Sequence, residues 1–187
     1  DRKGQAVRCV RKGLGGRLED VVTAYTFTGA VDSTEVHAGV GYGSDFMAKT
    51  SYTYQYGKKT KMSLSVRHGA STQSRETGYV YDAIGRLERK ERQLTRTSKS
   101  MCSYTYDVHG WLKSVSSGGF REDLYYADGL DSACYNGNIS TVRWKARNDS
   151  EYKGYNLRYD GCNRLYLALF GTGDNLTGNR NYFNEQA

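Results

Sequence analysis

The stretch Tyr79-Val80-Tyr81-Asp82-Ala83-Ile84-Gly85-Arg86-Leu87 decides the fold, because the chain repeats its pattern at 104–112. The second copy reads Tyr104-Thr105-Tyr106-Asp107-Val108-His109-Gly110-Trp111-Leu112. A third copy, at 155–165, reads Tyr155-Asn156-Leu157-Arg158-Tyr159-Asp160-Gly161-Cys162-Asn163-Arg164-Leu165. An internal repeat constrains the architecture of a chain more strongly than any single residue does. The sequence therefore predicts a repetitive β surface rather than a compact enzyme.

The turn positions of these copies recur at a nearly constant interval. Gly85 and Gly110 are 25 residues apart, Gly137 follows 27 residues later, and Asn163 follows after 26 more. This phase locates a degenerate fourth copy at Tyr135–Ile139. The residues that define the repeat are Tyr79, Tyr81, Asp82, Gly85, Leu87, Tyr104, Tyr106, Asp107, Gly110, Leu112, Gly137, Ile139, Tyr159, Asp160 and Leu165.

Toward the N-terminus the repeat becomes harder to follow. The stretch Tyr52-Thr53-Tyr54-Gln55-Tyr56-Gly57 lies in phase, with Gly57 28 residues before Gly85. Gly16, in Gly16-Arg17-Leu18, is the next candidate turn and lies 41 residues before Gly57. That gap predicts an insertion or a decayed unit around residues 28–48. We therefore divide the chain into a divergent N-terminal region at 1–50, expected to be β, and repeats of about 26 residues at 51–187.

Each copy has the chemistry of a β-hairpin. Tyrosines two positions apart place their rings on one face of a strand, where aromatic residues fit well. In the Asp-x-x-Gly segment that follows, Asp can bond the backbone ahead of it and Gly can adopt positive φ, so the four residues predict a turn. Leu18, Leu112 and Ile139 are each followed by Val three positions later. That spacing breaks strict alternation and predicts a bulge just after the turn.

Composition agrees with continuous sheet. The 187 residues include 22 glycines and 17 tyrosines but no proline, where average usage would give about nine. Proline removes a donor from the strand ladder and is kept out of central strands. No apolar run approaches the ~20 residues of a membrane-spanning helix. We expect an all-β fold of stacked antiparallel hairpins in a curved, spiralling sheet. We further expect the chain to be a fragment of a larger protein.

The Tyr-x-Tyr-Asp-x-x-Gly-Arg-Leu phrase at intervals near 26 resembles the YD repeat of the Rhs family. That family includes bacterial Rhs proteins, shell components of insecticidal toxin complexes and the animal teneurins. The resemblance covers residues 50–187 well and 1–50 poorly. The segments Phe120–Tyr126 and Tyr135–Ile139 further resemble Rhs-like proteins of gut-type Bacteroidetes.

The resemblance implies an arc of a hollow shell that encloses and delivers a C-terminal effector toxin in competition between bacteria. The implied partners are further YD repeats and the effector of the same polypeptide, at an extracellular or cell-surface location. The family's aspartate-dependent self-cleavage element has an Asp-Pro-x-Gly signature, which is absent from this proline-free chain. Within the chain, the resemblance therefore predicts a structural segment without catalysis or cofactor.

A cell-surface carbohydrate-binding adhesin module is the alternative function. Rows of exposed aromatic rings suit stacking on sugars, whereas buried rings suit packing between neighbouring repeats. Packing is the favoured interpretation for Tyr54, Tyr81, Tyr106 and Tyr159. The candidate ligand-facing aromatics are Tyr52, Tyr54, Trp111 and Trp144.

The cysteines and the basic residues each have a structural interpretation. Cys9, Cys102, Cys134 and Cys162 lack C-x-x-C spacing, so no metal site is expected. A Cys134–Cys162 disulfide between adjacent units is geometrically conceivable. Nucleic acid or an anionic glycan could bind the basic residues between Arg86 and Lys99 in a chain of net charge +7, but a solvated hairpin face is favoured. These residues are Arg86, Arg89, Lys90, Arg92, Arg96 and Lys99.

Enzymatic motifs are weak throughout the sequence. The glycine-rich stretch Gly39–Ser44 lacks the second half of a nucleotide-binding loop. The histidines are His37, His68 and His109, and none accompanies a nucleophile motif. The acids Asp82, Asp107 and Asp160 recur at one position of the repeat, which favours turn formation over the paired carboxylates of a glycosidase.

Overall fold

The computed structural model describes residues 2–12, 18–39, 46–95, 97–177 and 185–186 of the chain, and every regular element within them is a β-strand. The all-β prediction is therefore confirmed. The strands are β1 (Arg8–Lys12), β2 (Leu18–Tyr25), β3 (Val31–Gly39), β4 (Phe46–Gln55), β5 (Lys58–His68), β6 (Ser71–Tyr81), β7 (Leu87–Gln93), β8 (Lys99–Tyr106), β9 (Leu112–Ser117), β10 (Phe120–Tyr125), β11 (Thr141–Ala146), β12 (Lys153–Tyr159), β13 (Leu165–Thr172) and β14 (Glu185–Gln186).

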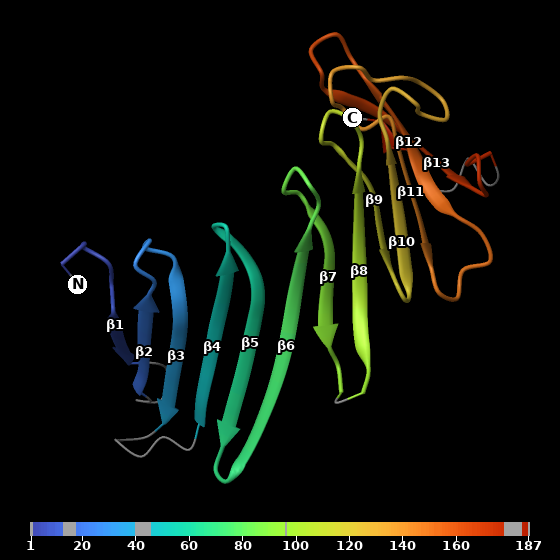
Figure 1. Ribbon diagram of the computed structural model, residues 1–187. Helices are drawn as coiled ribbons and strands as arrows, with labels where there is room; N and C mark the ends of the chain where they lie inside the picture. Colours follow the sequence, from blue (N-terminus) through green and yellow to red (C-terminus); the bar gives the residue numbers. More distant parts are fainter. Residues whose placement is uncertain (1, 13–17, 40–45, 96, 178–184, 187) are drawn as a thin grey trace. The chain divides into compact units, whose positions relative to one another are not determined.

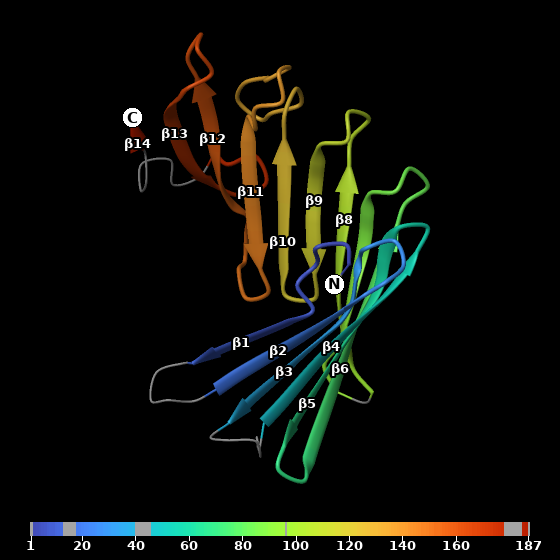
Figure 2. The same cartoon turned by 90° about the vertical axis from the view of Figure 1, so that its left-hand side faces the viewer.

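The described residues fall into two compact units. The first lies within Asp1–Gly85 and Lys90–Ser100, and the second within Arg86–Arg89 and Met101–Ala187. In each unit the strands pair antiparallel and in chain order, from β1 to β6 in the first and from β8 to β14 in the second (Figures 1 and 2). Each strand therefore pairs with its neighbours in sequence, as stacked hairpins require.

The predicted Asp-x-x-Gly turns form as expected. The amide of Gly85 donates to the carbonyl of Asp82 at 2.9 Å, and the amide of Gly110 donates to that of Asp107 at 3.1 Å. Gly85 and Gly110 have φ of 88° and 86°. This left-handed region is energetically unfavourable for any residue that carries a Cβ atom. In the third copy Asn163 takes the glycine's place with φ of 62°. The aspartates are therefore turn formers.

The predicted bulge lies one residue into the returning strand. Tyr106 pairs with Leu112, but Thr105 pairs with Ser114, so Lys113 is the extra residue. The same register shift follows the turns at Tyr25, Tyr54 and Tyr159. It accounts for the spacing of three after Leu112. Leu18, by contrast, pairs with Lys12 in a ladder without a shift, so the bulge predicted after Leu18 is wrong.

The N-terminal gap contains a decayed unit. Gly29 donates to the carbonyl of Thr26 at 3.0 Å and has φ of 89°, as in the other turns. Thr26 replaces the aspartate, and its hydroxyl accepts from the amide of Ala30 at 3.1 Å. Gly29 lies 28 residues before Gly57, which restores the repeat interval. The alternative turn proposed at Gly16 lies outside the described residues.

Two tyrosines assigned to strands lie elsewhere. Tyr56 was predicted to share a strand face with Tyr52 and Tyr54, but it occupies the turn before β5 with φ of 51° and is 93% exposed. Tyr135 was interpreted as part of a strand in the fourth copy, but it lies in a loop and is 81% exposed. Phase located the turn of that copy correctly, because Gly137 has φ of 92°.

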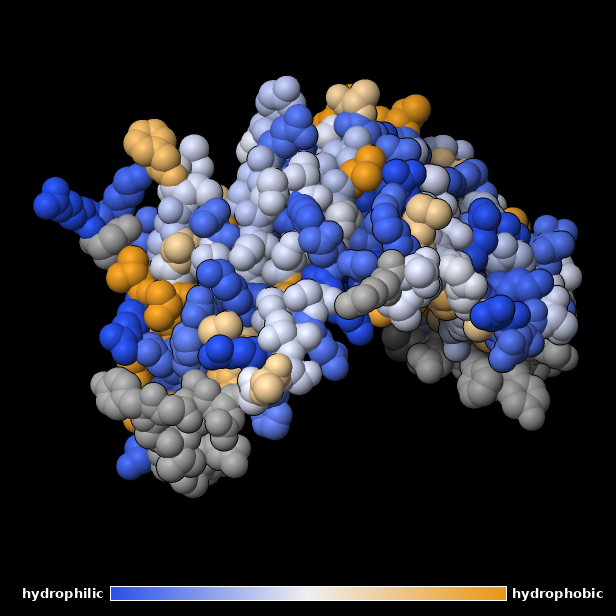
Figure 3. All heavy atoms as spheres, turned by 60° about the horizontal axis from the view of Figure 1, so that its bottom comes forward, coloured by the Kyte–Doolittle hydropathy of each residue, from blue (hydrophilic) through white to orange (hydrophobic). Residues whose placement is uncertain are grey.

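Few apolar side chains are buried. Among the described residues they are Tyr126, Ala168, Phe170 and Leu176, all in the second unit. Leu176 is 1% exposed and covers Gly171, where an added Cβ would meet the backbone oxygen of Leu176 at 2.0 Å. On the face shown in Figure 3, hydrophobic residues lie in small groups among hydrophilic ones. The units depend on pairing between neighbouring strands more than on a large core.

Candidate functional site

The tyrosine that ends the first strand of each hairpin links that hairpin to the one before it. Tyr106 at the end of β8 donates its hydroxyl to the carbonyl of Leu87, the first residue of β7, at 2.9 Å. Leu87 opens the returning strand of the preceding hairpin. The hydrogen bond therefore joins two hairpins at the same end as their Asp-x-x-Gly turns.

The same junction recurs in both units with oxygen–oxygen distances of 2.8–3.0 Å. The donors and acceptors are Tyr25 and Ala6, Tyr54 and Val31, Tyr81 and Lys59, Tyr106 and Leu87, Tyr126 and Leu112, and Tyr159 and Ile139. Burial raises the pKa of the Tyr126 and Tyr159 hydroxyls above their ordinary value of 10.0, so both remain donors at neutral pH. We call these contacts the tyrosine junctions.

The first tyrosines of neighbouring copies share a lysine. In the first unit the ammonium of Lys59 lies 4.5 Å from the ring centroid of Tyr52 and 5.9 Å from that of Tyr79. The ammonium of Lys90 also lies 5.9 Å from the centroid of the Tyr79 ring. Cation–π contacts of this kind contribute about 0.5–1 kcal/mol at exposed sites. They supplement the tyrosine junctions along the same row.

The four candidate ligand-facing aromatics make contacts within the protein. The hydroxyl of Tyr54 is used in a tyrosine junction, and the ring of Tyr52 faces Lys59. Trp111 stacks on His109 with centroids 4.6 Å apart and contacts Tyr126 at 5.0 Å. The ring centroid of Trp144 lies 6.0 Å from that of Tyr155.

The basic residues predicted between Arg86 and Lys99 are largely engaged. Arg86 donates to the carbonyl of Asp107 at 3.0 Å and lies 4.7 Å from the centroid of Tyr106. Lys90 faces Tyr79, and Lys99 pairs with Glu91 at 3.5 Å. Arg96 lies outside the described residues. These contacts support the interpretation of the stretch as part of a hairpin.

Two of the histidines lie beside carboxylates, and the four cysteines are unpaired. His37 contacts Glu35 on the same strand at 2.7 Å, and the His109 side chain is 63% exposed. All four cysteines are free thiols, so the conceivable Cys134–Cys162 disulfide is not formed. No three of the described His, Cys, Asp and Glu side chains are placed to hold a metal ion. The glycine-rich stretch Gly39–Ser44 lies, except for Gly39, outside the described residues.

A buried ionic cluster in the second unit is not apparent in the repeat. The carboxylate of Asp123 is 7% exposed and accepts hydrogen bonds from Arg121 at 3.0 Å and Arg143 at 3.1 Å. The guanidinium of Arg143 also lies 4.3 Å from the ring centroid of Tyr152. The fully paired Asp123 joins β10 to β11 and acts as a structural contact.

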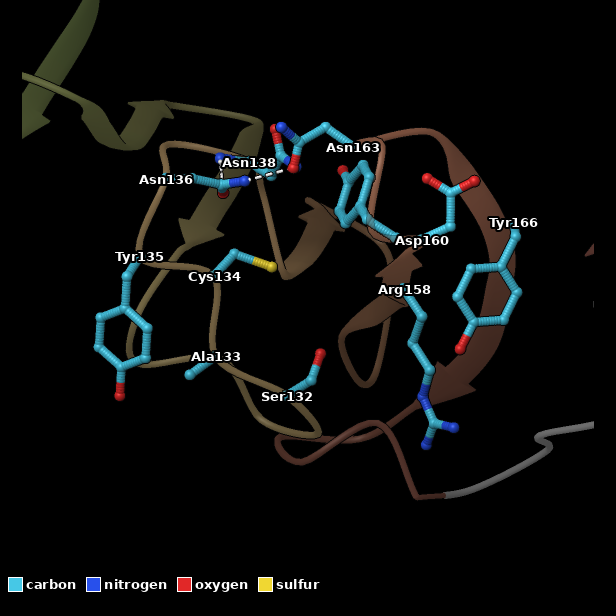
Figure 4. A pocket seen from close by; sticks show the side chains of 11 residues that line it. Ser132, Ala133, Cys134, Tyr135, Asn136, Asn138, Arg158, Asp160, Asn163 and Tyr166 are labelled. Carbon is cyan, nitrogen blue, oxygen red and sulfur yellow. Dashed lines mark hydrogen bonds between the residues drawn. The ribbon is translucent and has the colours of Figure 1, made fainter.

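A pocket in the second unit interrupts the regular repeat. Four tyrosine junction donors, among them Tyr106 and Tyr159, lie six positions before the apolar residue that follows the turn, whereas Tyr126 lies thirteen positions before the corresponding residue, Ile139. The difference is seven extra residues. They lie in the loop between Tyr126 and Ile139, which walls a cavity of about 410 Å³ beside the turn at Asp160 (Figure 4). We call this cavity the loop pocket.

The loop is held at its base, flank and tip. At the base, the buried hydroxyl of Ser140 donates to the carbonyl of Tyr126 at 2.6 Å. At the flank, Asp131 accepts a hydrogen bond from Arg158 Nε at 2.9 Å and forms an ion pair with the same guanidinium at 2.8 Å. At the tip, the amide nitrogen of Asn136 donates to Asn163 Oδ1 at 2.6 Å (Figure 4). These anchors fix the loop against the following hairpin.

Two features of the sequence indicate the loop pocket, although neither belongs to the repeat pattern. Asn136 and Asn163 are 27 residues apart, which is one repeat interval, so their turns are expected to be lateral neighbours. The segment between the pair Tyr125-Tyr126 and the turn at Gly137 is longer than the corresponding segment in the other copies. Together these features mark an inserted loop next to a turn.

Comparison with protein-family models and with curated proteins finds no match to this chain. Among the described residues, no helix is long and apolar enough to cross a membrane.

Proposed function

We propose that this chain is a non-catalytic YD-repeat segment of a large secreted or surface-attached Rhs-type shell that encloses and delivers a C-terminal effector toxin in interbacterial competition. The tyrosine junctions carry this proposal. One hydrogen bond, made by the same residue of each copy, joins successive hairpins within both units at 2.8–3.0 Å. A junction that depends only on the neighbouring copy allows a wall to be extended one hairpin at a time.

The distribution of buried residues supports the same function. Domains that act alone usually pack two layers of secondary structure around one hydrophobic core. Here the buried apolar side chains of the described residues are confined to one unit, and the first unit has none. A single layer of hairpins is suited to a wall whose stability depends on its neighbours. The chemistry of delivery then belongs to the effector.

Protease protection of the full-length polypeptide tests the proposal. We expect the region downstream of this chain to resist a broad-specificity protease until the repeats unfold. The triple variant Tyr81→Phe, Tyr106→Phe, Tyr159→Phe should shorten the protection, because it removes three junction hydroxyls without removing their rings. The exposed Tyr56→Phe change is the matched control and should leave protection unchanged. Equal digestion of the downstream region with and without the repeats would contradict enclosure.

A further inference from the structure

We propose that the loop pocket binds a short neutral saccharide. Its volume of about 410 Å³ falls within the range of small-ligand sites in proteins. The residues that form it come from an inserted loop, which is additional to the repeat pattern, and from the turn and strands of the next hairpin. Tyr159 also lines the pocket, but its hydroxyl is used in the tyrosine junction with Ile139. The proposal does not depend on the scaffold function, because it is argued from the inserted loop, the asparagines and Tyr166.

The charges of the pocket favour a neutral ligand. The charged side chains that line it are Arg158 and Asp160. Arg158 is paired with Asp131 at 2.8 Å, and Asp160 is paired with Arg164 at 2.7 Å. Each charge is therefore already neutralised by an opposite one. A phosphate, sulfate or carboxylate ligand would have to compete with these ion pairs.

The polar groups of the pocket match hydroxyl groups. Asn136, Asn138 and Asn163 line it, and each carboxamide offers both donors and an acceptor. Asn163 Oδ1 accepts from Asn136 at 2.6 Å, while its amide nitrogen donates to no described residue. Sugar hydroxyls also both donate and accept. A cluster of carboxamides can therefore bind them without adding charge.

A tyrosine ring supplies the apolar part of the site. Tyr166 lines the pocket and is 44% exposed, and Figure 4 shows it at the opposite side from Cys134. The face of an aromatic ring packs well against apolar C–H groups, while its hydroxyl stays in water. Tyr135 points away from the cavity in Figure 4 and is not assigned to the site.

The test is an array of neutral, sialylated and sulfated glycans, followed by calorimetric titration of the strongest neutral binder. Two variants keep the backbone of the repeat. Asn163→Gly keeps the positive φ of the turn, since Gly85 and Gly110 occupy the same turn position. Tyr166→Thr changes the extra residue of the bulge to threonine, the residue type that occupies the equivalent position as Thr60. The control is Asn148→Ala, an exposed change in another turn of the same unit.

We expect binding to a neutral glycan that each pocket variant weakens about tenfold, as loss of one or two contacts implies, and that the control leaves unchanged. In the wild-type chain, the side-chain amide resonances of Asn136, Asn138 and Asn163 should shift on titration, a readout that does not depend on how the variants fold. No bound neutral glycan, a salt-sensitive preference for sulfated glycans, or unchanged affinity and resonances would each overturn the proposal.

Discussion

At the scale of single residues, the second tyrosine of each copy has two roles. Its ring is half-buried or buried between hairpins. Its hydroxyl donates to a backbone carbonyl near the start of the returning strand of the preceding hairpin. Because a buried carbonyl without a donor costs free energy, phenylalanine cannot replace this tyrosine without loss. The recurrence of tyrosine at this position follows from that hydrogen bond.

Tyr106→Phe tests the value of one junction. It deletes the hydroxyl that donates to Leu87 and leaves the ring in place. We expect the free energy of unfolding to fall by about 1 kcal/mol, the usual net value of such a bond. Urea denaturation measures the change. Tyr56→Phe, which removes a hydroxyl from a side chain that is 93% exposed, should cost nothing measurable. Equal effects of the two changes would show that the junction hydroxyl contributes no stability.

Asp160→Asn tests the charge of a turn aspartate. The backbone amide of Arg164 and then its guanidinium hold the pKa of Asp160 below its ordinary value of 3.8. A lowered pKa in the folded state means that the ionised carboxylate stabilises the fold above about pH 4, and that this contribution is lost as the pH falls through the folded-state pKa. Asparagine keeps the oxygen that accepts from Cys162 and Arg164 but lacks the charge.

The stability difference between wild type and Asp160→Asn should therefore be largest at neutral pH and vanish in strong acid. Urea denaturation at a series of pH values from 7 to 2 measures it. A difference that stays constant over this range would show that the ion pair with Arg164 does not act in the turn.

At the scale of the hairpin, the turn conformation is the feature most open to local test. Gly110 has φ of 86°, and a Cβ added there meets no atom within 4 Å. Gly110→Ala should therefore destabilise the chain by about 1–2 kcal/mol through backbone strain alone. Gly118→Ala is the control, because its surroundings are equally open and its φ is not in the left-handed region. Thermal or urea unfolding of both variants measures the contrast, and equal stabilities would contradict the turn geometry.

The hairpins could be predicted from sequence because their signals are local. Asp82 and Gly85 specify a turn by their own side chains and backbone, and strand pairing then follows from chain order. The turn at Gly29 was not predicted, because Thr26 replaces the aspartate there. The hydroxyl of Thr26 nevertheless accepts the equivalent hydrogen bond, from the amide of Ala30. The strand positions predicted for Tyr56 and Tyr135 were wrong for a different reason. Both lie near turns, and the spacing of tyrosines alone does not show where a strand ends.

The candidate sites were less predictable, because they depend on distant residues. The acceptor of each tyrosine junction is a backbone carbonyl 14–23 residues away, which has no side-chain signature. The loop pocket requires Asp131 and Arg158, 27 positions apart, to meet across neighbouring hairpins. Trp111 is a candidate ligand-facing aromatic, and its stacking on His109 within its own turn could not be predicted from the repeat. Aromatic residues were recognised, but their partners were not.

At the scale of the whole molecule, stability within each unit comes from contacts between adjacent strands. Among the described residues, buried apolar side chains are few, and β2 is the one strand that pairs with β1. An exposed strand edge is a template for pairing with another chain. Such an arrangement gains stability when further hairpins cover the edge, which agrees with the proposed role as a segment of a longer wall.

Cryo-electron microscopy of the full-length polypeptide tests the central claim most directly. The account predicts that residues 79–117 pair in chain order as hairpins of a continuous wall, that tyrosine junctions such as that of Tyr106 with Leu87 recur in the repeats beyond this chain, and that the wall surrounds the downstream region. A map in which these residues instead form part of a two-layered globular domain, with the downstream region outside it, would contradict the account.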